Sequence, residues 1–179
     1  MRQALKIHPD SRCAAVTRIE VEVARPRPGQ LSLHYILTGT MGDLRLPPVT
    51  MPARTDELWR HTCFEAFVKT LSVDGYSEFN FAPSTQWAAY RFDAYRSGMR
   101  PASDVNVPYI KVTSNRSGFE LQVTLDGMAD LPRDAPWRLG LSAVIEEASG
   151  AKSYWALAHP PGKPDFHHAD CFVLEVPAA

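Results

Sequence analysis

The chain has 179 residues, of which 45% are hydrophobic and 22% charged, and its 19 basic and 20 acidic side chains leave a net charge of −1. This composition is typical of a folded globular protein, and it excludes a strongly basic surface for nucleic acid or for an anionic membrane. No stretch approaches the roughly 18–20 consecutive apolar residues that a membrane span requires.

The beginning of the chain and the cysteines indicate the compartment. Residues 1–11 carry several charged side chains and no continuous apolar stretch, so we expect no secretory leader and a cytoplasmic protein. Cys13, Cys63 and Cys171 are widely spaced and form no CxxC pair, which argues against a disulfide framework or a structural zinc site. We predict one domain, residues 1–179, large enough to bury its own core.

Alternation of apolar and polar residues is the main structural signal. It covers residues 17–23, stops at a Pro- and Gly-rich break at residues 25–29, and resumes over residues 31–38, which predicts an antiparallel hairpin. The same alternation predicts strands over residues 119–126 and 137–145. Weaker patterns predict strands at residues 62–71, 77–82, 86–92, 107–113, 153–157 and 170–176. About ten short strands and no convincing helical stripe predict an all-β antiparallel β-sandwich.

The familiar catalytic motifs are missing from the sequence. It contains no GxSxG elbow, glycine-rich phosphate loop, HExxH helix or dinucleotide fingerprint, so we predict that it is not an enzyme. Residues 159–171 concentrate imidazole, carboxylate and thiol groups, but their spacing fits no metal motif. The adjacent His167 and His168 would point to opposite sides of an extended chain. We therefore predict no metal site, and a proline-stiffened loop that can form the rim of a pocket.

Aromatic and charged residues provide the better functional signal. Trp59 and Glu65 fall on one face of a predicted strand, opposite the apolar Phe64, Ala66 and Val68. Exposed aromatic rings stack on the apolar faces of sugars, and neighbouring charged groups bond the hydroxyls.

Arg91 lies on the face of its strand opposite Tyr90 and Phe92, and it is a candidate for such a hydroxyl contact. Two structural interpretations stay open. The tryptophans can pack in the core of the sandwich, and Glu65 and Arg91 can form an ion pair across adjacent strands.

Several blocks of the sequence resemble a bacterial DOMON-like family that is related to the family 9 carbohydrate-binding modules. These blocks are Leu58–Val68, Tyr76–Ser84, Trp87–Phe92, Tyr154–Pro160 and Pro164–His168. The resemblance implies an Ig-like or jelly-roll sandwich with a cleft that binds sugar or haem. In the sugar-binding relatives two tryptophans clamp a saccharide while a glutamate and an arginine bond its hydroxyls. The matching positions in this chain are Trp59, Trp155, Glu65 and Arg91.

The preferred interpretation is a non-catalytic module that binds a saccharide or a similar polar small molecule. The predicted ligand-binding residues are Trp59, Glu65, Arg91, Trp155 and His159. One alternative is a haem-binding domain, with Met41, Met51 or Met99 and either His159 or His167 as axial ligands. The other is a structural or partner-docking domain without a small ligand. The preferred interpretation needs no cofactor, and a calcium ion that supports a loop stays open.

Overall fold

The computed structural model describes residues 1–70, 74–126, 128 and 131–179. In these residues the chain forms twelve β-strands and three short 3₁₀ helices, and no helix is long and apolar enough to cross a membrane. The strands are β1 (Arg2–Ile7), β2 (Val16–Ala24), β3 (Gln30–Gly39), β4 (Cys63–Lys69), β5 (Tyr76–Phe81), β6 (Trp87–Phe92), β7 (Arg100–Pro101), β8 (Tyr109–Ser114), β9 (Gly118–Asp126), β10 (Trp137–Glu146), β11 (Lys152–Ala156) and β12 (Leu174–Val176). The 3₁₀ helices are η1 (Met41–Asp43), η2 (Leu58–Arg60) and η3 (Ala169–Cys171).

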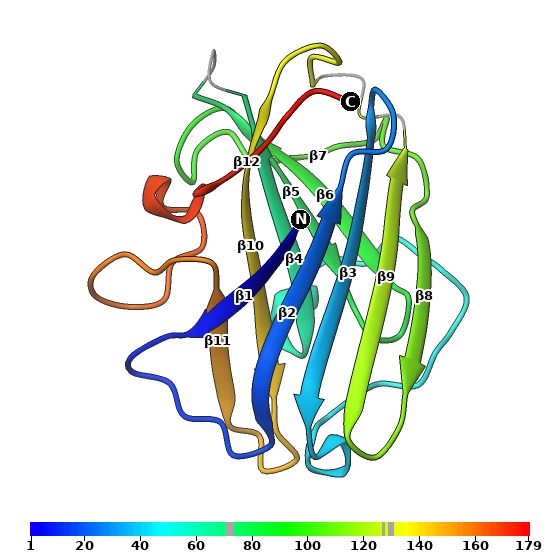
Figure 1. Cartoon of the computed structure of the whole chain (residues 1–179), viewed down its shortest axis with the longest axis vertical. Coiled ribbons are helices and arrows are strands. Elements are labelled where there is room, and N and C mark those ends of the chain that lie inside the picture. Colours follow the sequence, from blue (N-terminus) through cyan, green and yellow to red (C-terminus); the bar gives the residue numbers. More distant parts are fainter. Residues whose placement is uncertain (71–73, 127, 129–130) are drawn as a thin grey trace.

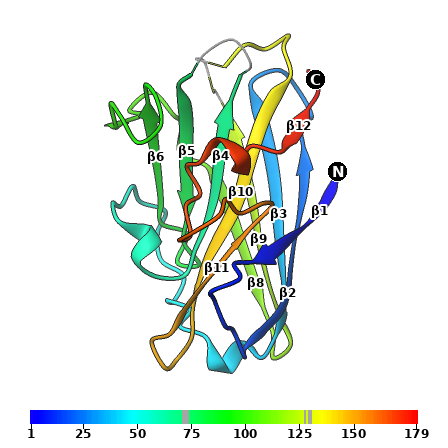
Figure 2. The ribbon, with the colours of Figure 1, turned by 90° about the vertical axis from the view of Figure 1, so that its left-hand side faces the viewer.

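The strands form two antiparallel sheets that lie face to face (Figure 1), and Figure 2 shows them edge-on. Sheet A has the order β1-β2-β3-β9-β8, and sheet B has the order β7-β6-β5-β4-β10-β11, with β12 paired to the first residues of β10. Strand β1 joins the sheets, because its first part pairs with β2 while Lys6 and Ile7 pair with β11. The predicted antiparallel β-sandwich is confirmed, with twelve strands in place of about ten.

The main core lies between the sheets and takes every second residue of their strands. In β3 and β9 the inward residues, such as Leu33, Tyr35 and Leu121, are at most 1% exposed, whereas the residues between them are partly exposed. Sheet B contributes its own inward set, which includes Phe64, Ala66, Phe79, Phe81, Trp87, Leu139, Leu141, Ala143 and Trp155. The hydroxyl of Tyr35 donates to the backbone oxygen of Glu65 at 2.8 Å, so this buried polar group is satisfied.

Sheet B is buried on its outer face as well. Strands β4 and β5 are buried along nearly their whole length, and not at alternate residues only. Their outer face carries a second apolar cluster, made of Leu58, Cys63, Phe67, Tyr76, Ala82, Ala88, Tyr90, Phe92, Val144, Ala156, Phe166 and Phe172. The cover comes from η2 and from the segment between β11 and β12, drawn in orange to red in Figure 2. This covered face is where a pocket can form.

Each predicted strand overlaps a strand of the structure, and two observed strands were not predicted. The predicted hairpin is confirmed as β2 and β3, whose turn contains Gly29 at φ 75°, a conformation that glycine adopts without strain. The alternation does not predict β1 or β7, because β1 buries only Leu5 and β7 has just two residues. The strand predicted over residues 170–176 is wrong in its first half, where η3 ends at Cys171. Residue 71, the end of another predicted strand, lies outside the described residues.

Candidate functional site

A pocket of about 380 Å³ opens on the outer face of sheet B. Glu65 of β4 and Glu78 of β5 line it from the sheet, and Trp59 of η2 and Tyr154 of β11 line it from the sides. The loops after β6 and before η3 complete the wall. The pocket therefore draws its residues from several separate parts of the chain, brought together on the outer face of sheet B.

The register of β4 and β5 brings two glutamates onto the same face. Glu65 pairs with Asn80 and Phe67 pairs with Glu78, so all four side chains point to the outer side of sheet B. Glu65 and Glu78 are diagonal neighbours in this arrangement, a position from which long side chains interact. They are only 3% and 5% exposed, respectively.

Burial makes both carboxyl groups hard to ionise. Desolvation, with the nearby charge of Glu78 as the next cause, raises the pKa of Glu65 to about 8, and desolvation raises the pKa of Glu78 to about 7. The Ser142 hydroxyl donates to Glu65 at 3.2 Å and the Asn80 amide donates to Glu78 at 2.7 Å, which favours the charged forms without offsetting burial. Near neutral pH the pair therefore retains a proton, so it can donate as well as accept hydrogen bonds.

Two partly exposed aromatic rings stand beside the carboxyl groups. The indole of Trp59 meets the ring of Tyr90 edge-on, with 6.0 Å between centroids, and the centroid of the Tyr154 ring lies 6.2 Å from that of Phe166. Both Trp59 and Tyr154 pack only partly against the outer apolar cluster, so each keeps some surface open. Open rings next to polar groups can stack on a sugar while the polar groups bond its hydroxyls.

The rim of the pocket is tied together by polar contacts between two loops. Arg96 donates to Asp165 at 2.7 Å, and the same carboxylate accepts a hydrogen bond from the Tyr95 hydroxyl. His167 lies deeper, with Nδ1 2.8 Å from the Tyr76 hydroxyl. Desolvation lowers the pKa of His167 to about 4, so its ring is neutral near pH 7.

The fold is similar to that of carbohydrate-binding modules. A candidate carbohydrate-binding protein from Bacteroides uniformis ATCC 8492 superposes with a TM-score of 0.71 and 14% identity, over 96% of this chain and 84% of that one. A family 9 carbohydrate-binding module from Caldicellulosiruptor kristjanssonii, in complex with cellotriose, superposes with a TM-score of 0.51 and 9% identity, over 90% of this chain and 74% of that one. No protein-family model and no curated protein matches the sequence. At these identities the likeness shows a shared fold.

Two of the five predicted ligand residues lie in the pocket. Trp59 and Glu65 both line it, although Trp59 lies in η2 and only Glu65 lies on β4. Trp155 does not line the pocket. It is 5% exposed, it packs in the core between the sheets, and its indole nitrogen donates to the Ser153 hydroxyl at 2.9 Å. The prediction that Trp155 is a ligand-binding residue beside Trp59 is corrected, because neighbours in a strand point to opposite faces and the pocket side belongs to Tyr154.

Arg91 and His159 also lie away from the pocket. The outer side of β6 carries Tyr90 and Phe92, so Arg91 points to the other side, where it forms an ion pair with Asp104 at 2.8 Å. An ion pair between Glu65 and Arg91 is wrong for the same reason, and because β5 separates their strands. His159 Nε2 lies 2.8 Å from the backbone oxygen of Lys6, next to β1.

Sequence reasoning did not name Glu78, Tyr154 or Arg96 as residues of the pocket. The alternation in β5 could have placed Glu78 on the outer face of the sheet, since Tyr76, Glu78 and Asn80 alternate with residues that face the core. Tyr154 could have been considered as well, because it precedes the candidate Trp155 in the strand and points to the opposite face. No signal pointed to Arg96, because its loop takes a position that no periodic pattern describes. His167 was named as a candidate haem ligand, in a loop predicted to form the rim of a pocket.

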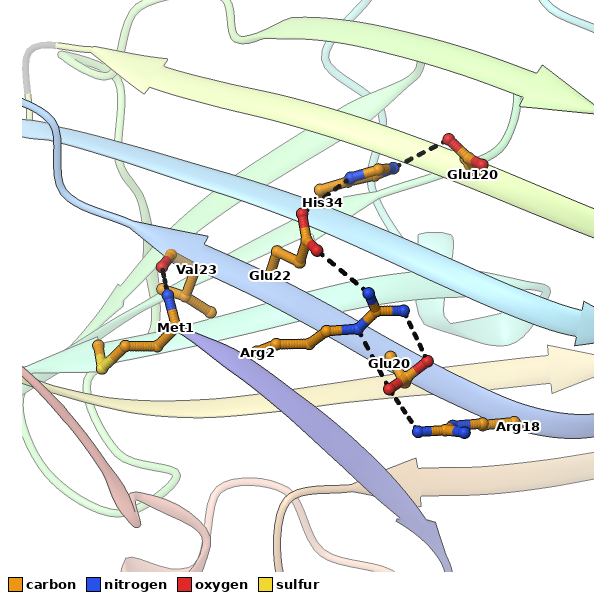
Figure 3. Close-up of polar contacts among 8 residues, drawn as sticks. All are labelled: Met1, Arg2, Arg18, Glu20, Glu22, Val23, His34 and Glu120. Carbon is orange, nitrogen blue, oxygen red and sulfur yellow. Dashed lines mark hydrogen bonds and ion pairs between the residues drawn. The ribbon is translucent and has the colours of Figure 1, made fainter.

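Two other hollows carry charges that are already paired. In one of about 710 Å³ beside η2, Glu146 binds Arg45 at 3.0 Å and His61 at 2.7 Å. The other, of about 470 Å³, lies on the outer face of sheet A, where Figure 3 shows a row of ion pairs. There Arg2 binds Glu20 at 2.8 Å and Glu22 at 3.4 Å, Arg18 binds Glu20 at 2.6 Å, and His34 lies 3.0 Å from Glu120. Their ionic groups have partners, which favours the pocket of Glu65 as the candidate site.

The positions of the candidate ligands can be compared with what a metal ion or a haem would need. Among the described residues, no group of three or more His, Cys, Asp or Glu side chains could hold a metal ion. Met99 and His167 line the same pocket, whereas Met41 is buried in the core and Met51 is 84% exposed. However, Nδ1 of His167 contacts the Tyr76 hydroxyl and its Nε2 lies 3.9 Å from Glu78. The Tyr76 hydroxyl occupies Nδ1, and a haem held by Met99 and His167 stays a prediction.

Proposed function

We propose that this protein is a non-catalytic module that binds a saccharide or a similar polar small molecule in the pocket of Trp59, Tyr154, Glu65 and Glu78. The observation that carries this proposal is the placement of two partly exposed rings beside two buried carboxyl groups on one sheet face. The rings offer stacking surface, and the carboxyl pair offers both donors and acceptors to hydroxyl groups. The similarity in fold to carbohydrate-binding modules supports it. Membership of the DOMON-like family and a cytoplasmic location are part of the same proposal.

The carboxyl pair itself favours binding over hydrolysis. A glycosidase needs one carboxyl group that is protonated and a second that is ionised, and it sets their pKa values apart through different surroundings. Here burial is the main cause that raises the pKa of both Glu65 and Glu78, so their surroundings act on the two carboxyl groups in the same direction. This supports a role in which the pair orients a ligand.

Trp59 provides a direct test of saccharide binding. Trp87, Trp137 and Trp155 are at most 5% exposed in the core, so a change in tryptophan fluorescence on adding sugar should come from Trp59. We expect glucose, cellotriose or another sugar in a broad panel to change the emission, and Trp59→Ala to remove the change. Loss of one stacking ring should weaken binding about tenfold, equivalent to about 1.4 kcal/mol.

The matched control is Tyr109→Ala, which removes a 64% exposed ring from sheet A. This variant should bind like the wild type. A flat response across the panel, with Trp59→Ala indistinguishable from the wild type by calorimetry, would remove the proposal.

A further inference from the structure

The two carboxyl groups of the pocket have no basic partner of their own. Glu65 and Glu78 are 3% and 5% exposed, and their polar contacts come from neutral groups, the Ser142 hydroxyl and the Asn80 amide. Among the described residues, no lysine or arginine nitrogen lies within 4.0 Å of either carboxyl group. Buried carboxylates are usually paired with a cation, so this pair is incomplete.

The nearby basic groups do not supply the missing charge. His167 Nε2 lies 3.9 Å from Glu78, but desolvation lowers the pKa of His167 to about 4, so the ring is neutral near pH 7. Arg96 lines the same pocket and lowers the pKa of both glutamates from a distance. Its guanidinium group is bound to Asp165 at 2.7 Å, so it already has a carboxylate partner outside the pair.

The remaining titratable groups around the pair come from four strands and the segment before η2. They are Cys63 on β4, Tyr76 on β5, Tyr90 on β6 with Asp56 beside it, and Tyr154 on β11. Burial raises the pKa of Cys63 and of both Tyr76 and Tyr90 above their usual values, so these three groups carry no charge near pH 7. None of these groups adds a positive charge, and the pocket can take a cation from outside.

The walls of the pocket suit a cation as well. The partly exposed indole of Trp59 and the ring of Tyr154 line the pocket together with the two carboxyl groups. Aromatic faces attract ammonium groups, most strongly where water is excluded. A carboxyl pair flanked by aromatic rings can thus bind an ammonium group and, beside it, an apolar sugar face.

We propose that the ligand carries a protonated amino group, as an amino sugar does, and that Glu65 and Glu78 bind this ammonium group at the base of the pocket. This inference rests on the proposed saccharide-binding function and narrows its ligand class. A neutral sugar would leave the two buried carboxyl groups without a counter-charge. A protonated amine supplies that charge and allows the pair to ionise.

The test compares three sugars of related shape by titration calorimetry at about pH 7, where such amines are still largely protonated. They are glucosamine, glucose and N-acetylglucosamine, of which only the first carries a positive charge. We expect glucosamine to bind the wild type at least ten times more tightly than the other two. We also expect it to release protons on binding, seen as a dependence of the measured heat on the ionisation enthalpy of the buffer.

Variants separate this inference from the proposed function. In Glu65→Gln and Glu78→Gln the preference for glucosamine over glucose should fall to near one, and proton release should disappear. Glu120→Gln removes a 47% exposed carboxylate from sheet A and should keep both effects. Equal binding of glucose and glucosamine by the wild type would overturn the inference and leave the proposed function intact. Absence of binding by any sugar would overturn both.

Discussion

Replacing both Glu65 and Glu78 by glutamine is expected to stabilise the folded protein at alkaline pH and to change its stability little in acid. Both carboxyl groups are buried without a cationic partner among the described residues, so ionising them in the folded state is costly. The amide of glutamine has a similar shape and carries no charge at any pH. It can accept from the Ser142 hydroxyl or from the Asn80 amide as the carboxyl groups do.

The direction follows from the protons that each state binds. Burial raises the pKa of Glu65 from its ordinary 4.5 to about 8 and that of Glu78 from 4.5 to about 7. Between the ordinary and the raised values the folded state binds more protons than the unfolded state, so the free energy of unfolding falls as the pH rises. The contribution of the two protonated carboxyl groups to the free energy of unfolding is fully present below pH 4.5. It is lost as the pH rises through their raised pKa values, about 7 and about 8. A tenfold change in proton affinity corresponds to about 1.4 kcal/mol, so the wild type should lose several kcal/mol.

Urea unfolding measured between about pH 4 and pH 9 checks this expectation. The wild type should become markedly less stable over this interval, and the double variant should lose much less. Glu120→Gln, on the exposed face of sheet A, should follow the wild type. A wild-type stability that stays constant from acid to alkaline pH would show that the two carboxyl groups ionise freely, contrary to this account.

Trp155→Ala is expected to reduce the free energy of unfolding by about 3–5 kcal/mol, the range for removing a large ring from a packed core. Trp155 is 5% exposed between the sheets and forms a hydrogen bond to Ser153. Trp59→Ala should cost about 1 kcal/mol or less, because the ring of Trp59 is only partly buried. Trp155→Ala should therefore mainly reduce stability, whereas Trp59→Ala should mainly reduce ligand binding.

Thermal and urea unfolding of the two variants, beside their affinity for the best sugar, measure this contrast. Trp155→Phe serves as a control that keeps most of the buried volume, and it should recover much of the stability lost in Trp155→Ala. If Trp155→Ala remained as stable as the wild type and lost its ligand, Trp155 would belong to the binding surface after all.

The fold could be predicted from sequence because its main signal is local. Strands such as β3 and β9 bury one face and expose the other, so apolar and polar residues alternate along their sequence. The alternation did not predict strand β1, which joins the two sheets, because Leu5 is its only buried residue. The sequence also did not predict that both faces of β4 and β5 are buried, because this burial depends on loops from distant parts of the chain.

The site could be predicted only in part, for a related reason. Parity within β4 was enough to place Glu65 on the outer face of the strand. Trp59 also lines the pocket, but it lies in η2, where the alternation does not apply. Choosing between Tyr154 and Trp155 required knowledge of which side of β11 faces the core, and a change of one residue reverses that choice. Arg96 and His167 reach the pocket from loops, where tertiary contacts and not sequence period determine position.

The most direct test of the account is the location of the bound ligand, followed by ¹H–¹⁵N NMR during titration with glucosamine. The four tryptophan indoles give separate signals, and we expect the Trp59 indole to move together with the amides of Glu65 and Tyr154. The indoles of Trp137 and Trp155, in the core, should stay in place. Signal changes confined to the outer face of sheet A, with Trp59 unmoved, would contradict the pocket on sheet B as the binding site.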